Sequence, residues 1–153
     1  MRIGDHWPGV AALIISSEMR FVQDQKTQNW DAEVTFRGAT IHLTIDRVHP
    51  VTKHEALAAS ALKRVEEAWP SVEDSLLRHL HPLYNREWAD PDRGFPPFGA
   101  KEFLSQIRLE SIDLLDEEGA LSLFFDDSGM FAGHCIHIFW NSDGKMYDAG
   151  LEG

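Results

Sequence analysis

The chain has 153 residues, of which 43% are hydrophobic and 25% are charged. Such a length and composition are typical of one globular domain that buries roughly two-thirds of its unfolded surface, which excludes a disordered chain. The formal net charge of −11 opposes binding to nucleic acids and anionic lipids, because both are bound through lysine and arginine. It favours a basic partner, or serves only to keep the protein in solution.

A single cysteine, Cys135, excludes an intramolecular disulfide and fits a reducing compartment. The sequence contains no run of about 18 apolar residues that could cross a membrane. The apolar stretch from Val10 to Ile15 is shorter than the core of a usual signal peptide, so we assign it to the fold. These features predict a cytoplasmic protein that consists of one domain, residues 1–153.

Hydrophobic and polar residues alternate over residues 30–36 and again over 41–45, with Gly38 between the two stretches. A period of two is typical of half-buried strands, and the glycine supplies a turn, so these residues predict a β-hairpin. The upstream stretch 10–22 fits either short strands or one helix.

Two helices are expected next. Apolar residues at helical spacing predict a helix that begins near Lys53 and ends near Trp69, where Pro70 follows. Ser71 is a candidate N-cap for a second helix, whose apolar stripe continues to Leu83 and which should end near Trp88.

Three prolines and two glycines predict a loop over residues 89–99, and a short helix should follow over 100–107. The remaining residues predict four strands, at 109–115, 120–126, 131–140 and 145–151. Short turns rich in Asp, Asn, Ser and Gly separate them, which is typical of hairpin connections. The predicted fold class is therefore α+β, with an N-terminal hairpin and a C-terminal four-strand meander packed against two or three helices.

The sequence predicts neither a metal site nor a cofactor. His134 and His137 should point to opposite faces of one strand, and Cys135 with His137 supplies only half of a structural zinc site. No Gly-x-Ser-x-Gly motif is present, nor is a glycine-rich phosphate loop. These patterns favour a protein that is not an enzyme.

Two groups of acidic residues are candidates for function. Asp126 and Asp127 could act as an acid and base or hold a cation, but adjacent carboxylates in a turn more often cap it. The run formed by Asp113, Asp116, Glu117 and Glu118 is either a solvated turn or a contact surface for a basic partner. The candidate partner-binding residues are thus Asp113, Asp116, Glu117, Glu118, Asp126 and Asp127.

The order of the motifs resembles a group of uncharacterised bacterial domains. The resemblance covers roughly residues 20–153 and depends on Phe131-x-Gly133-His134 followed by the closing Glu152-Gly153. Ala132 is a departure, because members of the group more often have Trp before Gly-His. The resemblance implies an immunity protein, which binds and neutralises a toxin encoded beside it.

We therefore expect an interaction protein without catalytic activity, whose partner is a basic toxin domain. The alternative is a small hydrolase or metal-dependent enzyme that uses His134 with Asp126 or Asp127. A third possibility is a small-ligand module built on the aromatic residues Trp88, Phe95 and Phe98. The sequence does not determine the oligomeric state.

Overall fold

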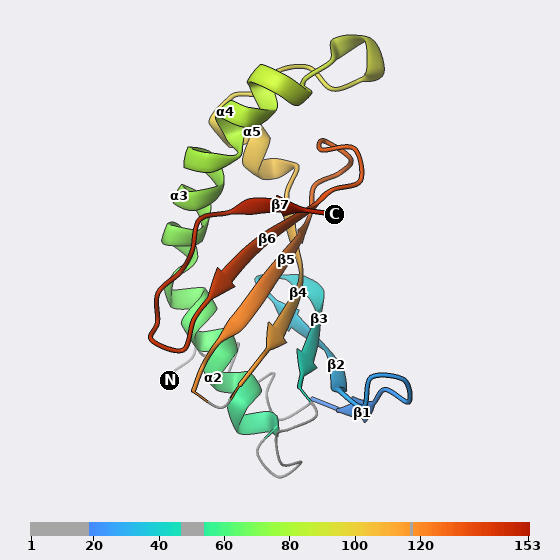
Figure 1. Cartoon of the computed structure of the whole chain (residues 1–153), viewed down its shortest axis with the longest axis vertical. Coiled ribbons are helices and arrows are strands. Elements are labelled where there is room, and N and C mark those ends of the chain that lie inside the picture. Colours follow the sequence, from blue (N-terminus) through green and yellow to red (C-terminus); the bar gives the residue numbers. More distant parts are fainter. Residues whose placement is uncertain (1–18, 47–53, 117) are drawn as a thin grey trace.

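The computed structural model describes residues 19–46, 54–116 and 118–153. Their strands form a seven-stranded sheet in which the strand order follows the chain (Figure 1). The fold is α+β, as the sequence predicts. The strands are β1 (Val22–Gln23), β2 (Trp30–Phe36), β3 (Ala39–Ile45), β4 (Arg108–Leu114), β5 (Leu121–Asp126), β6 (Cys135–Trp140) and β7 (Gly150–Glu152).

The predicted N-terminal hairpin is confirmed. Strands β2 and β3 pair antiparallel from Trp30 opposite Ile45 to Phe36 opposite Ala39. Alternate residues of both strands are buried, as their period of two requires. Of the ambiguous stretch 10–22, residues 10–18 lie outside the described residues, and Val22 begins the short strand β1.

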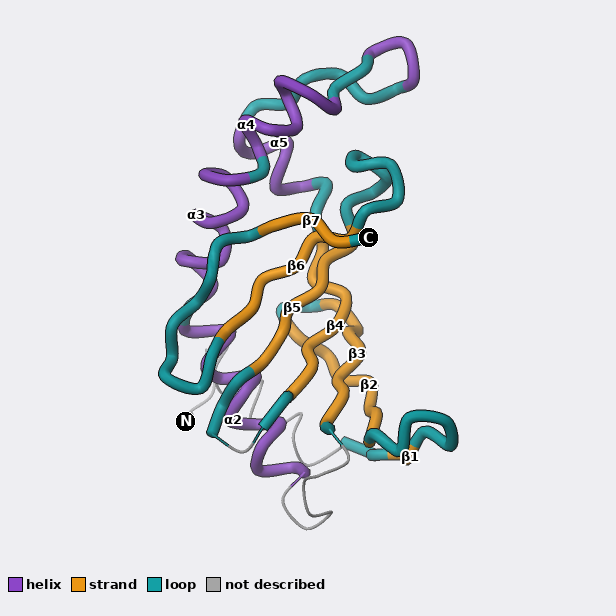
Figure 2. Tube along the Cα trace, viewed as in Figure 1, coloured by secondary structure: helices purple, strands orange, loops and turns teal. Residues whose placement is uncertain are grey.

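The hairpin and the C-terminal meander join into one sheet through a parallel pair, which the sequence does not predict. Strand β4 pairs parallel to β3, from His42 opposite Ser111 to Ile45 opposite Leu114. A parallel pair needs a long crossover connection, and the helices supply it. The two long helices of this crossover lie on one side of the sheet (Figure 2).

The crossover begins with α2 (His54–Glu67) and α3 (Trp69–His79). The N-cap of α3 is Ala68 rather than Ser71, so the predicted cap is wrong. Pro70 stands in the first turn instead, where its missing N–H leaves no hydrogen bond unmade. A proline thus starts this helix as well as ending the previous one.

Helical structure continues to Trp88, as predicted, but in separate pieces. They are α4 (His81–Leu83) and the π-helical turn η2 (Tyr84–Trp88). The predicted proline loop then includes the 3-10 turn η3 (Pro91–Arg93), and α5 (Ala100–Ser105) completes the crossover.

Strands β4 to β7 form the predicted antiparallel meander, but two of them are shorter than expected. The predicted strand from Phe131 begins only at Cys135, because Ala132 and Gly133 have positive φ angles of 53° and 92° and form a turn. The last strand begins at Gly150 rather than Lys145, although Met146 makes an isolated bridge to Trp140.

The core lies between the sheet and the helices α2 and α3. Leu62 of α2, Val72 of α3, Leu43 of β3, Ile112 of β4 and Leu123 of β5 are all 0% exposed. Burying each such side chain contributes about 1.5–3 kcal/mol. In the part of the chain that the structure describes, no helix covers the opposite face of the sheet (Figure 1). We call this opposite face the open face.

Candidate functional site

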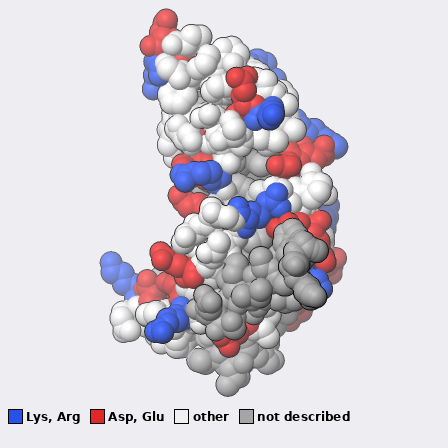
Figure 3. Space-filling model, turned by 180° about the vertical axis from the view of Figure 1, so that it is seen from behind, with Lys and Arg blue, Asp and Glu red and all other residues white. Residues whose placement is uncertain are grey.

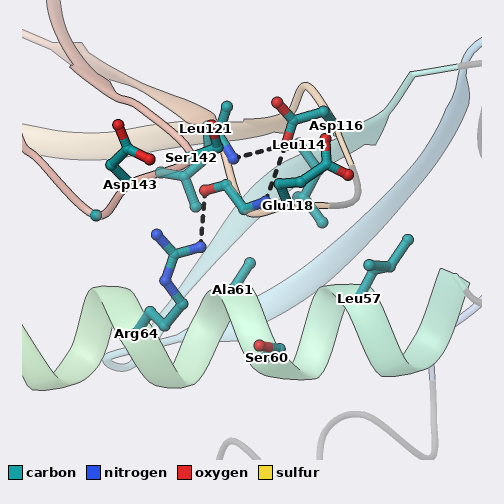
Figure 4. Close-up of a pocket in the computed structure, with 13 residues that line it drawn as sticks. Leu57, Ser60, Ala61, Arg64, Leu114, Asp116, Glu118, Leu121, Ser142 and Asp143 are labelled. Atoms are coloured by element: carbon teal, nitrogen blue, oxygen red, sulfur yellow. Dashed lines mark hydrogen bonds between the residues drawn. The ribbon is translucent and has the colours of Figure 1, made fainter.

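A notch opens where α2 faces the tips of the β4–β5 hairpin and of the β6–β7 connection. Its volume is about 290 Å³. Leu57, Ser60, Ala61 and Arg64 of α2 form one wall, and the residues at the two strand connections form the other (Figure 4). Because three carboxylates, those of Asp116, Glu118 and Asp143, line this space, we call it the acidic notch.

Arg64 extends from α2 across the acidic notch toward the β4–β5 tip (Figure 4). Its Nη1 donates a hydrogen bond of 2.8 Å to the carbonyl oxygen of Gly119. Its guanidinium carbon lies 5.1 Å from the ring centroid of Trp140, a cation–π distance. Arg64 therefore ties both strand connections to the helix and neutralises part of the acidic charge.

The acidic residues of the notch have different partners. One oxygen of Asp116 accepts hydrogen bonds from the backbone N–H groups of Gly119 at 2.8 Å and Ala120 at 2.9 Å, so Asp116 shapes the turn. Glu118 and Asp143 are exposed and lie at the two strand connections that line the notch (Figure 4). Glu117 lies outside the described residues. The notch can therefore receive a cationic group beside Arg64.

Asp113, predicted with the same acidic run, lies elsewhere. It is on the open face at β4, where Thr44 of β3 and Ser122 of β5 are its cross-strand neighbours. Burial raises the pKa of Asp113, and nearby Asp31 raises it further, while His42 and His137 act in the opposite direction. The predicted acidic run is thus divided between the notch and the open face.

Asp126 and Asp127 lie at the opposite end of β5 from the notch. Asp126 forms an ion pair with Arg108, which lowers the pKa of the Asp126 carboxyl group. The buried carboxylate of Asp127 accepts hydrogen bonds from the N–H groups of Gly129 at 2.9 Å and Phe131 at 2.8 Å. Both are engaged in the hairpin, which agrees with the capping interpretation.

His134 packs against an aromatic group instead of facing these carboxylates. Its ring lies edge-on to Trp88, with centroids 5.5 Å apart. Trp88 in turn contacts Phe131, and Tyr84 stacks on Phe98 at 5.5 Å. Phe95 lines a separate hollow of about 230 Å³ with Trp88. Within the described ranges, no group of three or more His, Cys, Asp or Glu side chains is placed to hold a metal ion.

Sequence reasoning missed a row of polar side chains on the open face. Ser122 of β5 and His137 of β6 are joined by a contact of 3.0 Å between Oγ and Nε2. The Nδ1 atom of the same ring lies 2.6 Å from Oε2 of Glu152 on β7. Strand alternation places Ser122 on one face of β5, but only the register between strands brings it to His137.

Together these features define an acidic α+β protein with a helical crossover on one face of its sheet. Residues 19–151 match the family described as "Uncharacterized protein conserved in bacteria" (DUF2262), and the chain belongs to that family. No curated protein and no solved structure matches the chain significantly. Among the described residues, no helix is long and apolar enough to cross a membrane.

Proposed function

We propose that this protein is an interaction protein of the immunity type, which binds a basic toxin domain and neutralises it. The observation that carries the proposal is the acidic notch, where Glu118 and Asp143 leave their carboxylates exposed beside a space of about 290 Å³. A lysine or arginine side chain of a partner fits a space of this size and charge. The resemblance described above is the reason for proposing a toxin as the partner, and the net charge of −11 agrees with a basic partner.

The notch is suited to recognition because hydrogen bonds hold its frame, whereas two of its carboxylates are exposed. Arg64 fixes the Gly119 carbonyl, and Asp116 holds the turn through two backbone N–H groups. Glu118 and Asp143 project from this frame without a described ion pair. Exposed charges of this kind raise the rate of association with an oppositely charged protein and exclude partners of the wrong sign.

The distribution of charge on the rest of the surface favours a local contact over a uniform field. Seen from behind, acidic and basic side chains are interspersed (Figure 3). Several surface carboxylates there and elsewhere have basic neighbours, such as Glu66 with Arg37 and Asp74 with Arg78. Specific recognition therefore depends on places where carboxylates lack such neighbours, of which the acidic notch is one.

The direct test is co-expression with the product of the neighbouring gene, which the proposal expects to be a toxin. The chain should rescue growth and copurify with the toxin.

Glu118→Lys should lower the association rate by about tenfold at low salt, since steering by charge accounts for factors of about 10–10³. Asp92→Lys is the matched control, because it makes the same charge change at an exposed residue of the proline loop. Absence of both rescue and complex would contradict the proposal.

A further inference from the structure

We propose that Ser122 is a reactive nucleophile on the open face of the sheet, activated by His137 and aligned by Glu152. These residues come from three neighbouring strands, β5, β6 and β7, which pair in that order. The contacts run in sequence, from Ser122 Oγ to His137 Nε2 at 3.0 Å and from His137 Nδ1 to Glu152 Oε2 at 2.6 Å. The inference concerns a different face from the acidic notch and does not depend on toxin binding.

The carboxylate determines which ring nitrogen of His137 carries the proton. An ionised carboxylate only accepts hydrogen bonds, so Nδ1 must carry the hydrogen that is shared with Glu152. In the neutral ring, Nε2 is then left as an acceptor for the hydroxyl hydrogen of Ser122. This is the arrangement in which a histidine acts as general base toward a serine.

The ring of His137 is also held in place by its neighbours. Phe124 stacks on it with centroids 4.7 Å apart and planes 17° from parallel. The His137 side chain is only 18% exposed, whereas that of Glu152 is 55% exposed. Packing and the carboxylate together fix the orientation of the imidazole, which is what a general base requires.

Ser122 is itself only 7% exposed, so its surroundings indicate a small, uncharged and partly apolar substrate. Phe139 of β6 lies directly opposite Ser122 and is half-buried, so it offers an apolar surface next to the hydroxyl. On the other side, Asp113 of β4 lies opposite Ser122 in the strand register, and burial raises the pKa of its carboxyl group. The substrate class that fits is a small carboxylic ester.

The chemistry balances with water as the only co-reactant. Ser122 Oγ forms a bond to the carbonyl carbon while its proton passes to His137 Nε2. The bond from that carbon to the leaving alcohol breaks, and the alcohol takes the proton from Nε2. Water then attacks the acyl-serine, gives its proton to Nε2, and releases the acid as the serine regains the proton.

The proposal is tested with a fluorophosphonate probe on the full chain, followed by intact mass and peptide mapping. Ser122 Oγ should displace fluoride and carry the phosphonyl group, and hydrolysis of p-nitrophenyl acetate should accompany labelling. His137→Gln should slow labelling by about 10²-fold or more, since general-base catalysis contributes about 10²–10⁴-fold. Glu152→Gln provides a second variant at an exposed position, and it should slow labelling in the same direction.

Ser105→Ala is the matched control, because the exposed Ser105 hydroxyl donates only to the backbone oxygen of Glu102. It should label at the wild-type rate, whereas Ser122→Ala should not label. The proposal is overturned if folded wild-type protein acquires no label or acquires it at another residue. It is also overturned if labelling of Ser122 is unchanged in folded Glu152→Gln. Labelling of Ser122 would in turn show that the expectation of a non-catalytic protein is wrong.

Discussion

Asp126 and Asp127 illustrate how two adjacent carboxylates serve different purposes. Asp126 is partly exposed and pairs with the exposed side chain of Arg108. Asp127 is 7% exposed, and its two oxygens accept hydrogen bonds from the backbone of the following turn. The turn that carries the Phe131-x-Gly133-His134 motif is therefore held by Asp127, whereas Asp126 adds a surface ion pair of small energy.

Removing the Asp127 carboxylate should destabilise the protein more than removing that of Asp126. Asp127→Ala leaves the N–H groups of Gly129 and Phe131 without their acceptor, and because that of Phe131 is buried the loss costs about 1–3 kcal/mol. Asp126→Ala, the matched control, should cost less than about 1 kcal/mol, as exposed ion pairs do. Urea denaturation of both variants measures the difference. Equal free energies of unfolding would contradict the capping role.

Asp113→Asn should stabilise the protein at neutral pH. Because burial raises its pKa above the ordinary value of 3.8, the folded state binds the proton more tightly than the unfolded state. Stability is therefore lost as pH rises from 3.8 through the folded pKa, and the cost persists above that value. The asparagine of the variant cannot ionise, so the variant does not bear the cost of a buried carboxylate. Its higher stability relative to the wild-type protein should therefore disappear when the pH falls below the ordinary pKa of the aspartate. Thermal melting of the wild-type protein and the variant between about pH 3 and pH 8 measures the sign of this stability difference. A variant that is less stable than the wild-type protein at neutral pH would contradict the prediction.

At the scale of elements, one hydrogen bond joins the helical layer to the end of the meander. The buried hydroxyl of Ser75 on α3 accepts from the backbone N–H of Ala149, at 2.9 Å, just before β7 begins. This contact links residues 74 positions apart. The hydrogen bond helps to fix where the short strand β7 begins. Strand β7 contains Glu152, which contacts His137.

Ser75→Ala should therefore loosen the last strand. The Ala149 N–H loses its acceptor, so the free energy of unfolding should fall by about 1–3 kcal/mol. Amide hydrogen exchange at Ala149 should accelerate more than exchange in β2 and β3. Ser105→Ala serves as the control, since its hydroxyl is exposed. Uniform acceleration in all strands would show that the bond has no local role.

Local patterns predict most of these elements, and they fail where the chain depends on non-local contacts. The alternation in residues 30–36 correctly identifies β2, because each residue's burial follows from the strand period. The expected strand from Phe131 fails because the buried Asp127 and the left-handed Ala132 form a turn there. The same limit applies to the sites. The turn role of Asp127 could be predicted from its neighbours, but the contact of Ser122 with His137 requires the register of β5 and β6.

At the scale of the whole molecule, the crossover gives the sheet one covered face and one open face. Helices α2 and α3 lie over the covered face, and α2 brings Arg64 to the two strand connections at the acidic notch. The polar row of Ser122, His137 and Glu152 lies on the open face. The two proposals therefore concern separate surfaces, so variants at one surface should leave the other intact.

The proposed recognition of a basic partner is tested most directly by calorimetric titration of this protein with the purified product of the neighbouring gene. We predict a one-to-one complex whose Kd rises when salt increases from about 0.05 to 0.5 M, because salt screens the charges that attract the partners. Glu118→Lys should weaken this complex and Asp92→Lys should not. No binding, or binding that neither salt nor Glu118→Lys changes, would contradict the account.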